Sequence, residues 1–131
     1  MKMQDKYRFR AWDKQEKKYI YGVEKGLNVV SQPTGNIRVL SIAEIDNSER
    51  YVLEQCSGLK DNDGRLIYEG DVVRVADSFN RGRYLVILKD GFFAAKDTNG
   101  WFSRLDEMDD DDDCIMRVIN NTQKYCNASA P

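Results

Sequence analysis

The stretch that most constrains the fold is Gly58–Val75, which reads GLKDNDGRLIYEGDVVRV and holds two tight corners within a short distance. The pair Asp63-Gly64 is typical of a two-residue hairpin turn, because both turn positions need a positive φ that glycine adopts freely. The triplet Glu69-Gly70-Asp71 predicts a second corner, and Val72–Val75 then has the apolar character of a buried strand. A chain that turns back twice over so few residues favours short antiparallel strands.

Two side chains of this stretch have predicted structural roles. We expect Tyr68 to pack into the core and Asp71 to accept hydrogen bonds from backbone amides at the second corner. Gly70 is predicted to have a positive φ, so a β-branched residue there would damage folding. The stretch is therefore a fold signature and only secondarily a candidate site. The residues predicted to form the turns of this signature are Gly58, Asp61, Gly64, Tyr68, Glu69, Gly70 and Asp71.

Short runs with strand periodicity, separated by Gly, Asn and Asp turns, make up the rest of the chain. Little of it has helical period, and Ser41–Asn47 fits either one helical turn or an irregular connection. The pattern predicts a mainly β protein, β-rich α+β at most, that closes as a small barrel or sandwich. The expected strands are Tyr7–Trp12, Tyr19–Val23, Leu27–Val30, Ile37–Leu40, Arg50–Cys56, Leu66–Tyr68, Val72–Val75, Arg83–Lys89, Phe92–Ala95 and Cys114–Ile119.

The strand spacing also predicts how the chain is divided. Residues 1–49 form an N-terminal β-hairpin region, and residues 50–120 carry five or six short strands, which is about right for an SH3-like β-barrel core. Residues 121–131 are a polar C-terminal tail.

Composition excludes several classes of site. The 131-residue chain has no histidine, which removes His-based triads, His general bases and His-containing metal sites. Its three cysteines are odd in number and lack a CxxC, so they predict reduced thiols in a cytoplasm rather than disulfides or zinc ligands. No signal peptide and no run of about 20 apolar residues is present, so we expect a cytoplasmic protein without a membrane segment.

Charge is distributed unevenly along the chain. Asp106, Glu107 and Asp109–Asp113 supply seven of the 22 acidic residues, so the remainder holds 15 acidic and 20 basic residues, a net of +5 against −2 for the whole chain. The run is typical of a solvated loop held open by self-repulsion. Cation binding and docking against a basic surface are the two alternatives. The separate pattern Asp61-x-Asp63-Gly64 resembles a calcium loop only superficially, since Leu59 and Gly70 stand where ligands are needed, and it predicts a β-turn.

The remaining candidates for chemistry are weak. Arg8, Arg10 and Trp12 share one face of a predicted strand, which favours a solvated surface or, as the sharper alternative, a nucleic-acid platform. The other basic residues are scattered, and no phosphate-binding glycine loop is present. Cys56 has no histidine to activate it. An enzyme that used carboxylates such as Glu69 and Asp71 would need a pocket that a sequence does not reveal.

The residues of the fold signature also carry a resemblance. The segment FRAWDKQEKKYIY (Phe9–Tyr21) resembles the opening of the YopX family of small bacteriophage and prophage proteins. Gly58, Leu59, Asp61, Gly64, Ile67, Tyr68, Glu69, Gly70, Asp71 and Val73 match the family's G-L-x-D-x-x-G-x-x-I-Y-E-G-D-x-V core. The chain departs from the family's usual closing strand, reading Val118-Ile119-Asn120-Asn121-Thr122, and the aspartate run resembles a loop insertion. The resemblance implies an SH3-like barrel with an added N-terminal β region, in a family that is largely uncharacterised.

From these observations we expect a phage or prophage accessory protein that works by binding and is not an enzyme. The expected partner is another protein or a second copy of the chain, ahead of nucleic acid, with no cofactor, metal or membrane involved. Nucleic-acid binding is the alternative, and a carboxylate-dependent enzyme is the third. The Gly58–Val75 stretch does not distinguish among them.

Overall fold

The chain is described by a computed structural model that covers residues 7–26, 28–32, 34–76, 81–109 and 114–121. It divides into two compact units, Met1–Gln55 and Cys56–Pro131, which are described separately below. The division falls within a strand, six residues after the boundary predicted from the sequence. Residues 122–131, most of the predicted polar tail, lie outside the described part.

The N-terminal unit is built on a central strand, β1 (Phe9–Asp13). It pairs in antiparallel fashion with β2 (Lys18–Tyr21) on one side and with the first half of β5 (Tyr51–Lys60) on the other. Ala11 lies opposite both Ile20 and Leu53. Because β1 has a neighbour along each edge and four of its five residues are buried, it is an interior strand.

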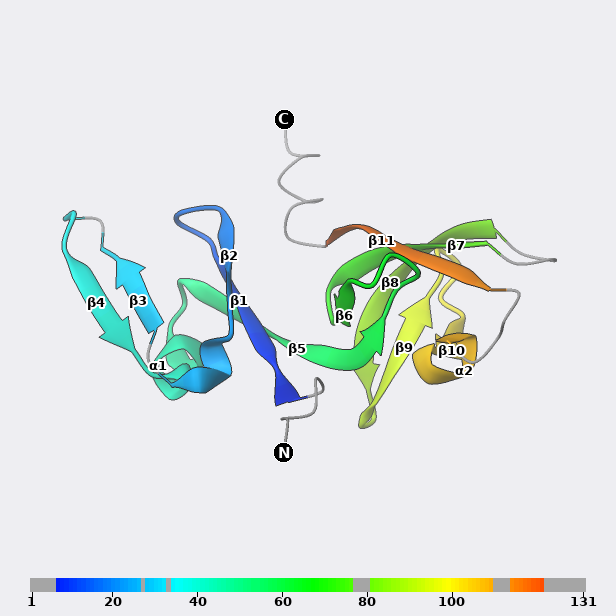
Figure 1. The fold of residues 1–131 in the computed structure, drawn as a ribbon, viewed down its shortest axis with the longest axis horizontal. Helices are drawn as coiled ribbons and strands as arrows, with labels where there is room; N and C mark the ends of the chain where they lie inside the picture. The colour runs from blue at the N-terminus through cyan, green and yellow to red at the C-terminus, as the bar shows by residue number, and fades with distance from the viewer. Residues whose placement is uncertain (1–6, 27, 33, 77–80, 110–113, 122–131) are drawn as a thin grey trace. The chain divides into compact units, whose positions relative to one another are not determined.

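The same unit contains a separate two-stranded hairpin, β3 (Asn28–Ser31) and β4 (Ile37–Leu40), visible in Figure 1. A 3-10 turn at Val23–Lys25 (η2) precedes it, and helix α1 (Ile42–Asn47) follows it. The helix begins with a capping box in which the Ser41 hydroxyl accepts from the Glu44 N–H and the Glu44 carboxylate accepts from the Ser41 N–H. The core of the unit is formed by Ala11, Val23, Val30, Leu40, Ile45 and Tyr51.

The C-terminal unit is a five-stranded sheet of order β10-β9-β8-β7-β11 that curls into a half-barrel (Figure 1). Its strands are β7 (Asp71–Ala76), β8 (Arg81–Lys89), β9 (Phe92–Lys96), β10 (Phe102–Arg104) and β11 (Ile115–Asn121). The short strand β6 (Leu66–Tyr68) pairs with the second half of β5, and helix α2 (Leu105–Asp109) follows β10. The core of the unit is Ile67, Val73, Val75, Val86, Ala95, Leu105 and Met116.

The mainly β prediction is confirmed, and most predicted strands lie within two residues of the observed ones. Three details are wrong. Gly58, with φ +84°, lies at an irregularity of pairing inside β5 and not in a turn. Asp63 lacks the positive φ of the two-residue turn predicted for Asp63-Gly64, whereas both residues of Asp90-Gly91 have it (φ +50° and +86°) and join β8 to β9. Helix α2 was not predicted.

Candidate functional site

Two of the three residues predicted to form a binding face on β1 are buried, so the prediction of an exposed face there is wrong. Arg10 and Trp12 are each 3% exposed, and only Arg8 is exposed. The Arg10 Nε atom donates to Glu54 Oε1 at 2.9 Å, and its guanidinium lies over the Tyr19 ring, 4.1 Å from the centroid. The Tyr19 hydroxyl donates to the same Glu54 oxygen at 2.9 Å. Arg10 is therefore part of an internal network, because β1 is covered on both faces.

A second buried ion pair fastens the end of β1 to the start of β5. Arg50 donates from Nε and Nη2 to the two carboxylate oxygens of Asp13, at 2.9 and 2.8 Å. Asp13 also accepts from the backbone N–H groups of Gln15 and Glu16. Burial acts to raise the pKa of Asp13, but these hydrogen bonds and the Arg50 charge outweigh it, so the pKa lies below its ordinary value. Asp13 is thus held ionised as a structural group.

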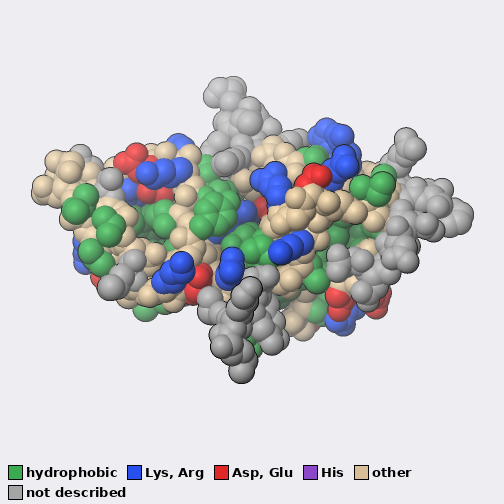
Figure 2. All heavy atoms as spheres, viewed as in Figure 1, with side chains coloured by type: hydrophobic (Ala, Val, Ile, Leu, Met, Phe, Trp, Pro, Cys, Tyr) green, Lys and Arg blue, Asp and Glu red, His purple; other side chains and the backbone are tan. Residues whose placement is uncertain are grey.

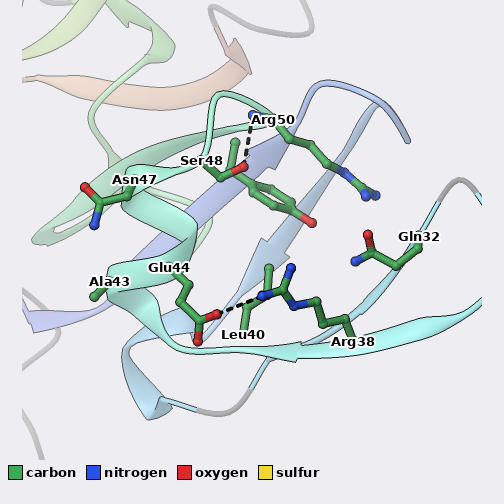
Figure 3. Close-up of a pocket in the computed structure, with 9 residues that line it drawn as sticks. Gln32, Arg38, Leu40, Ala43, Glu44, Asn47, Ser48 and Arg50 are labelled. Carbon is green, nitrogen blue, oxygen red and sulfur yellow. Dashed lines mark hydrogen bonds and ion pairs between the residues drawn. The ribbon is translucent and has the colours of Figure 1, made fainter.

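Beside this ion pair lies an open pocket of about 400 Å³, shown in Figure 3. Its charged groups have partners within the unit: Arg38 and Glu44 form an ion pair at 3.4 Å, and Arg50 is bound to Asp13. The Tyr51 hydroxyl is buried and has no hydrogen-bond partner among the described residues, and burial raises the pKa of this side chain. The pocket is lined by Gln32, Arg38, Leu40, Ala43, Glu44, Asn47, Ser48, Arg50 and Tyr51.

The signature residues of the C-terminal unit form backbone hydrogen bonds. Asp61 is 6% exposed, and one of its carboxylate oxygens accepts from the N–H groups of Asp63 and Arg65, both at 2.9 Å. Its other oxygen accepts from Val118 on β11 at 2.9 Å. The β-turn interpretation of this segment, in preference to a calcium loop, fits these contacts, since the Asp61 carboxylate is occupied by backbone donors.

The second corner behaves as expected. Asp71 is buried and accepts from the Tyr68 N–H at 2.9 Å, and Tyr68 is itself buried. Gly70 has φ +86°, and its N–H donates to the Val86 carbonyl at 2.8 Å. The predictions for Tyr68, Gly70 and Asp71 are confirmed, and the Asp71 carboxylate has a structural role at the corner.

The β3–β4 hairpin has an apolar face that the unit does not bury. Val29, Ile37 and Val39 are 63%, 72% and 50% exposed. Val29 and Val39 are direct cross-strand partners, and Ile37 lies two residues from Val39 on the same face. Figure 2 shows hydrophobic side chains at the surface over this hairpin. The alternation of β4 was visible in the sequence, but which face the unit buries was not.

Basic residues that are far apart in the sequence meet on the five-stranded sheet. Arg74 lies directly opposite Arg83 on one neighbouring strand and Arg117 on the other. No sequence pattern connects these three residues, because the order of the strands decides which of them are neighbours. The expectation that the basic residues are scattered is wrong for this surface.

Other site classes have little support in the described structure. Cys56 is buried and Cys114 half-buried, both as free thiols, and Cys126 lies outside the described residues, as do Asp110–Asp113 of the acidic run. Within the described ranges, no three His, Cys, Asp or Glu side chains gather as a metal site. None of the helices described here is long and apolar enough to cross a membrane.

Two solved structures have a similar fold, and one family model matches the sequence. The chain is similar over 94% of its length to protein EF1440 from Enterococcus faecalis, with 23% identity, 97% of that chain covered and a TM-score of 0.59. It is similar over 91% of its length to protein yopX from Bacillus subtilis, with 15% identity, 94% of that chain covered and a TM-score of 0.58. No curated protein sequence matches. The family model described as "YopX protein" matches residues 8–125. The chain therefore belongs to the YopX family.

Proposed function

We propose that this protein acts by binding and that its N-terminal unit binds a second copy of the chain through the apolar face of the β3–β4 hairpin. The observation that carries the proposal is the exposure of Val29, Ile37 and Val39 side by side on one face. When a partner removes apolar side chains grouped in this way from water, the free energy of the system falls, which favours association.

A second copy is the occupant that the chemistry of the hairpin favours. Arg38 is the one charged residue within β3 and β4, and it lies in register with Val30, on the opposite face from the three apolar residues. A two-fold contact brings the same patch from both copies together, so an uncharged apolar face meets another of its kind. A charged partner would be desolvated there without compensation.

The hairpin also offers backbone groups for such a contact. In the described structure β3 and β4 form a sheet of two strands, so each has an outer edge without a ladder partner. Unpaired edges are templates for pairing with another chain. Edge pairing of two hairpins would extend the sheet while the apolar faces remain together.

We also propose that the protein does not act as an enzyme. Asp71, one of the two carboxylates considered for an enzyme, is buried and binds the Tyr68 amide. The phage or prophage origin and the cytoplasmic location that the family resemblance implies belong to the same proposal, and self-association is the part that can be measured directly.

Sedimentation velocity of the full chain over about a hundredfold concentration range tests the proposal. The parent protein is expected to associate, and Ile37→Lys with Val39→Lys to remain monomeric with an unchanged unfolding midpoint. Ile115→Lys, which alters an exposed apolar side chain of the other unit, is the matched control and should associate like the parent. A parent protein that stays monomeric throughout, or a control that dissociates equally, would overturn the proposal.

A further inference from the structure

The outer face of the five-stranded sheet carries a concentration of positive charge. The inner face is fixed by the core residues Val73, Val75, Val86, Ala95 and Met116. Side chains alternate along each strand, so the residues between them point outward. The strand register places six exposed basic residues at outward positions of this sheet: Arg74, Arg83, Lys89, Lys96, Arg104 and Arg117. No Asp or Glu occupies an outward position on the described strands of the sheet.

Three of these residues form a row across adjacent strands. Arg83 on β8, Arg74 on β7 and Arg117 on β11 are consecutive cross-strand partners. Strands are spaced by about 4.8 Å, so the row spans about 10 Å. Arg117 has an exposed contact with Asp63 at 3.6 Å, while Arg74 and Arg83 have no ion-pair partner among the described residues. Like charges directly opposite one another destabilise a sheet, so the row is costly without an anion to bind.

The other end of the same face combines cations with aromatic rings. Phe102 on β10 is 41% exposed, and the Nζ atoms of Lys89 and Lys96 lie 4.5 and 5.8 Å from its ring centroid. The Arg104 guanidinium lies 5.0 Å from the centroid of Phe92 and also donates to both carboxylate oxygens of Asp106, which follows β10 in the chain, at 3.1 Å. Lysine has a flexible stem, so Lys89 can move from the ring to a neighbouring phosphate when a base stacks on Phe102.

We propose that this outer face binds a single-stranded nucleic acid, with phosphates on the Arg83–Arg74–Arg117 row and a base stacked on Phe102. From β10 to β11 the face spans four strand spacings, about 19 Å, which is enough for several nucleotides. Basic side chains interleaved with exposed aromatic rings are the combination that single-strand binding uses. The site is separate from the β3–β4 hairpin and does not depend on self-association.

Fluorescence anisotropy of a labelled oligothymidylate of about 16 nucleotides, titrated with the full chain at about 50 mM salt, tests the proposal. We expect binding that weakens steeply with salt and a loss of about tenfold or more in Arg74→Glu with Arg83→Glu. Lys14→Glu with Lys18→Glu makes the same change in net charge on exposed residues of the other unit and should leave affinity within about threefold. Far-UV circular dichroism would reveal whether charge reversal prevents folding. In that case Arg74→Gln with Arg83→Gln replaces the charge-reversal variant, and it should also lose affinity.

Three further binding measurements identify the class of ligand. Phe102→Leu should weaken single-strand binding about tenfold and leave binding of the matched duplex unchanged, because only an unpaired base stacks on the ring. Polyglutamate of equal charge should compete poorly. The proposal is overturned if the oligonucleotide does not bind at low salt, if the lysine control loses as much affinity as the arginine variant, if the duplex binds more tightly, or if polyglutamate competes as well as the oligonucleotide.

Discussion

The carboxylate of Asp61 accepts a hydrogen bond from the backbone N–H of Val118, 57 residues later in the chain, at 2.9 Å. The neighbouring residue repeats the connection: the Asn62 N–H donates to the Met116 carbonyl at 2.9 Å, and its side-chain oxygen accepts from the Met116 N–H. The 61–65 segment is thus tied to β11 as well as to itself. The aspartate in the signature holds the last described strand of the unit in place.

Asp61→Ala is expected to lower the free energy of unfolding by about 4.5 kcal/mol or more. It removes the acceptor of three backbone N–H groups, each hydrogen bond to a charged group contributing about 1.5 kcal/mol or more. Urea titration followed by circular dichroism measures the loss. Asp63→Ala is the control, because Asp63 is exposed and its contact with Arg117 is long. Equal effects of the two variants would contradict the role assigned to Asp61.

Gly70→Val is expected to destabilise the protein by about 2 kcal/mol or more, because β-branched residues rarely adopt a φ near +86°. Gly82→Ala provides the comparison. A Cβ atom there would meet the Tyr84 ring at 3.7 Å, an ordinary contact, and this glycine lies within β8 rather than in a turn. Thermal unfolding should show a large drop for the first variant and little change for the second. Parent-like stability of Gly70→Val would refute the strained corner.

Stability should fall in acid through the titration of Asp13. Its pKa in the folded protein is below the ordinary value, so its contribution is fully present above about pH 4 and is lost as the pH falls through the folded pKa. Asp13→Asn should be less stable than the parent at pH 7 but should lose less free energy of unfolding between pH 5 and strongly acidic solution. Parallel pH profiles of the two proteins would show that Asp13 is not the titrating group.

Tyr51→Phe should leave stability unchanged or raise it by up to about 1 kcal/mol. The substitution removes a buried hydroxyl that has no partner among the described residues, so no hydrogen bond is lost with it. Tyr19→Phe makes the same chemical change but removes the hydrogen bond to Glu54, so it should cost about 1 kcal/mol. Denaturant titration of both variants checks the contrast, and a larger loss for Tyr51→Phe would contradict it.

Local structure could be predicted well from the sequence, but contacts between residues far apart in the chain could not. The β8–β9 hairpin was predicted because Arg83–Lys89 and Phe92–Ala95 flank an Asp-Gly turn, and turn chemistry acts within a few residues. The partner of Arg10 is Glu54, 44 residues away, so alternation alone assigned Arg10 to a solvated face. Likewise, Arg74, Arg83 and Arg117 become neighbours only through the order β8-β7-β11. Helix α2 was missed because its acidic residues dominate the pattern, although Leu105 is buried in the core.

The Arg83–Arg74–Arg117 row has a regular backbone spacing. The spacing of the three backbone positions from which these arginine side chains extend is set by the hydrogen-bonded ladder between strands, which resists stretching and compression far more than a loop does. A polyanion that bends easily can match this spacing by adjusting its own backbone, whereas a stiff one binds only if its charges already recur at a similar distance. If this face binds a nucleic acid as proposed, the sheet would select its ligand by the spacing of the ligand's charges as well as by their sign.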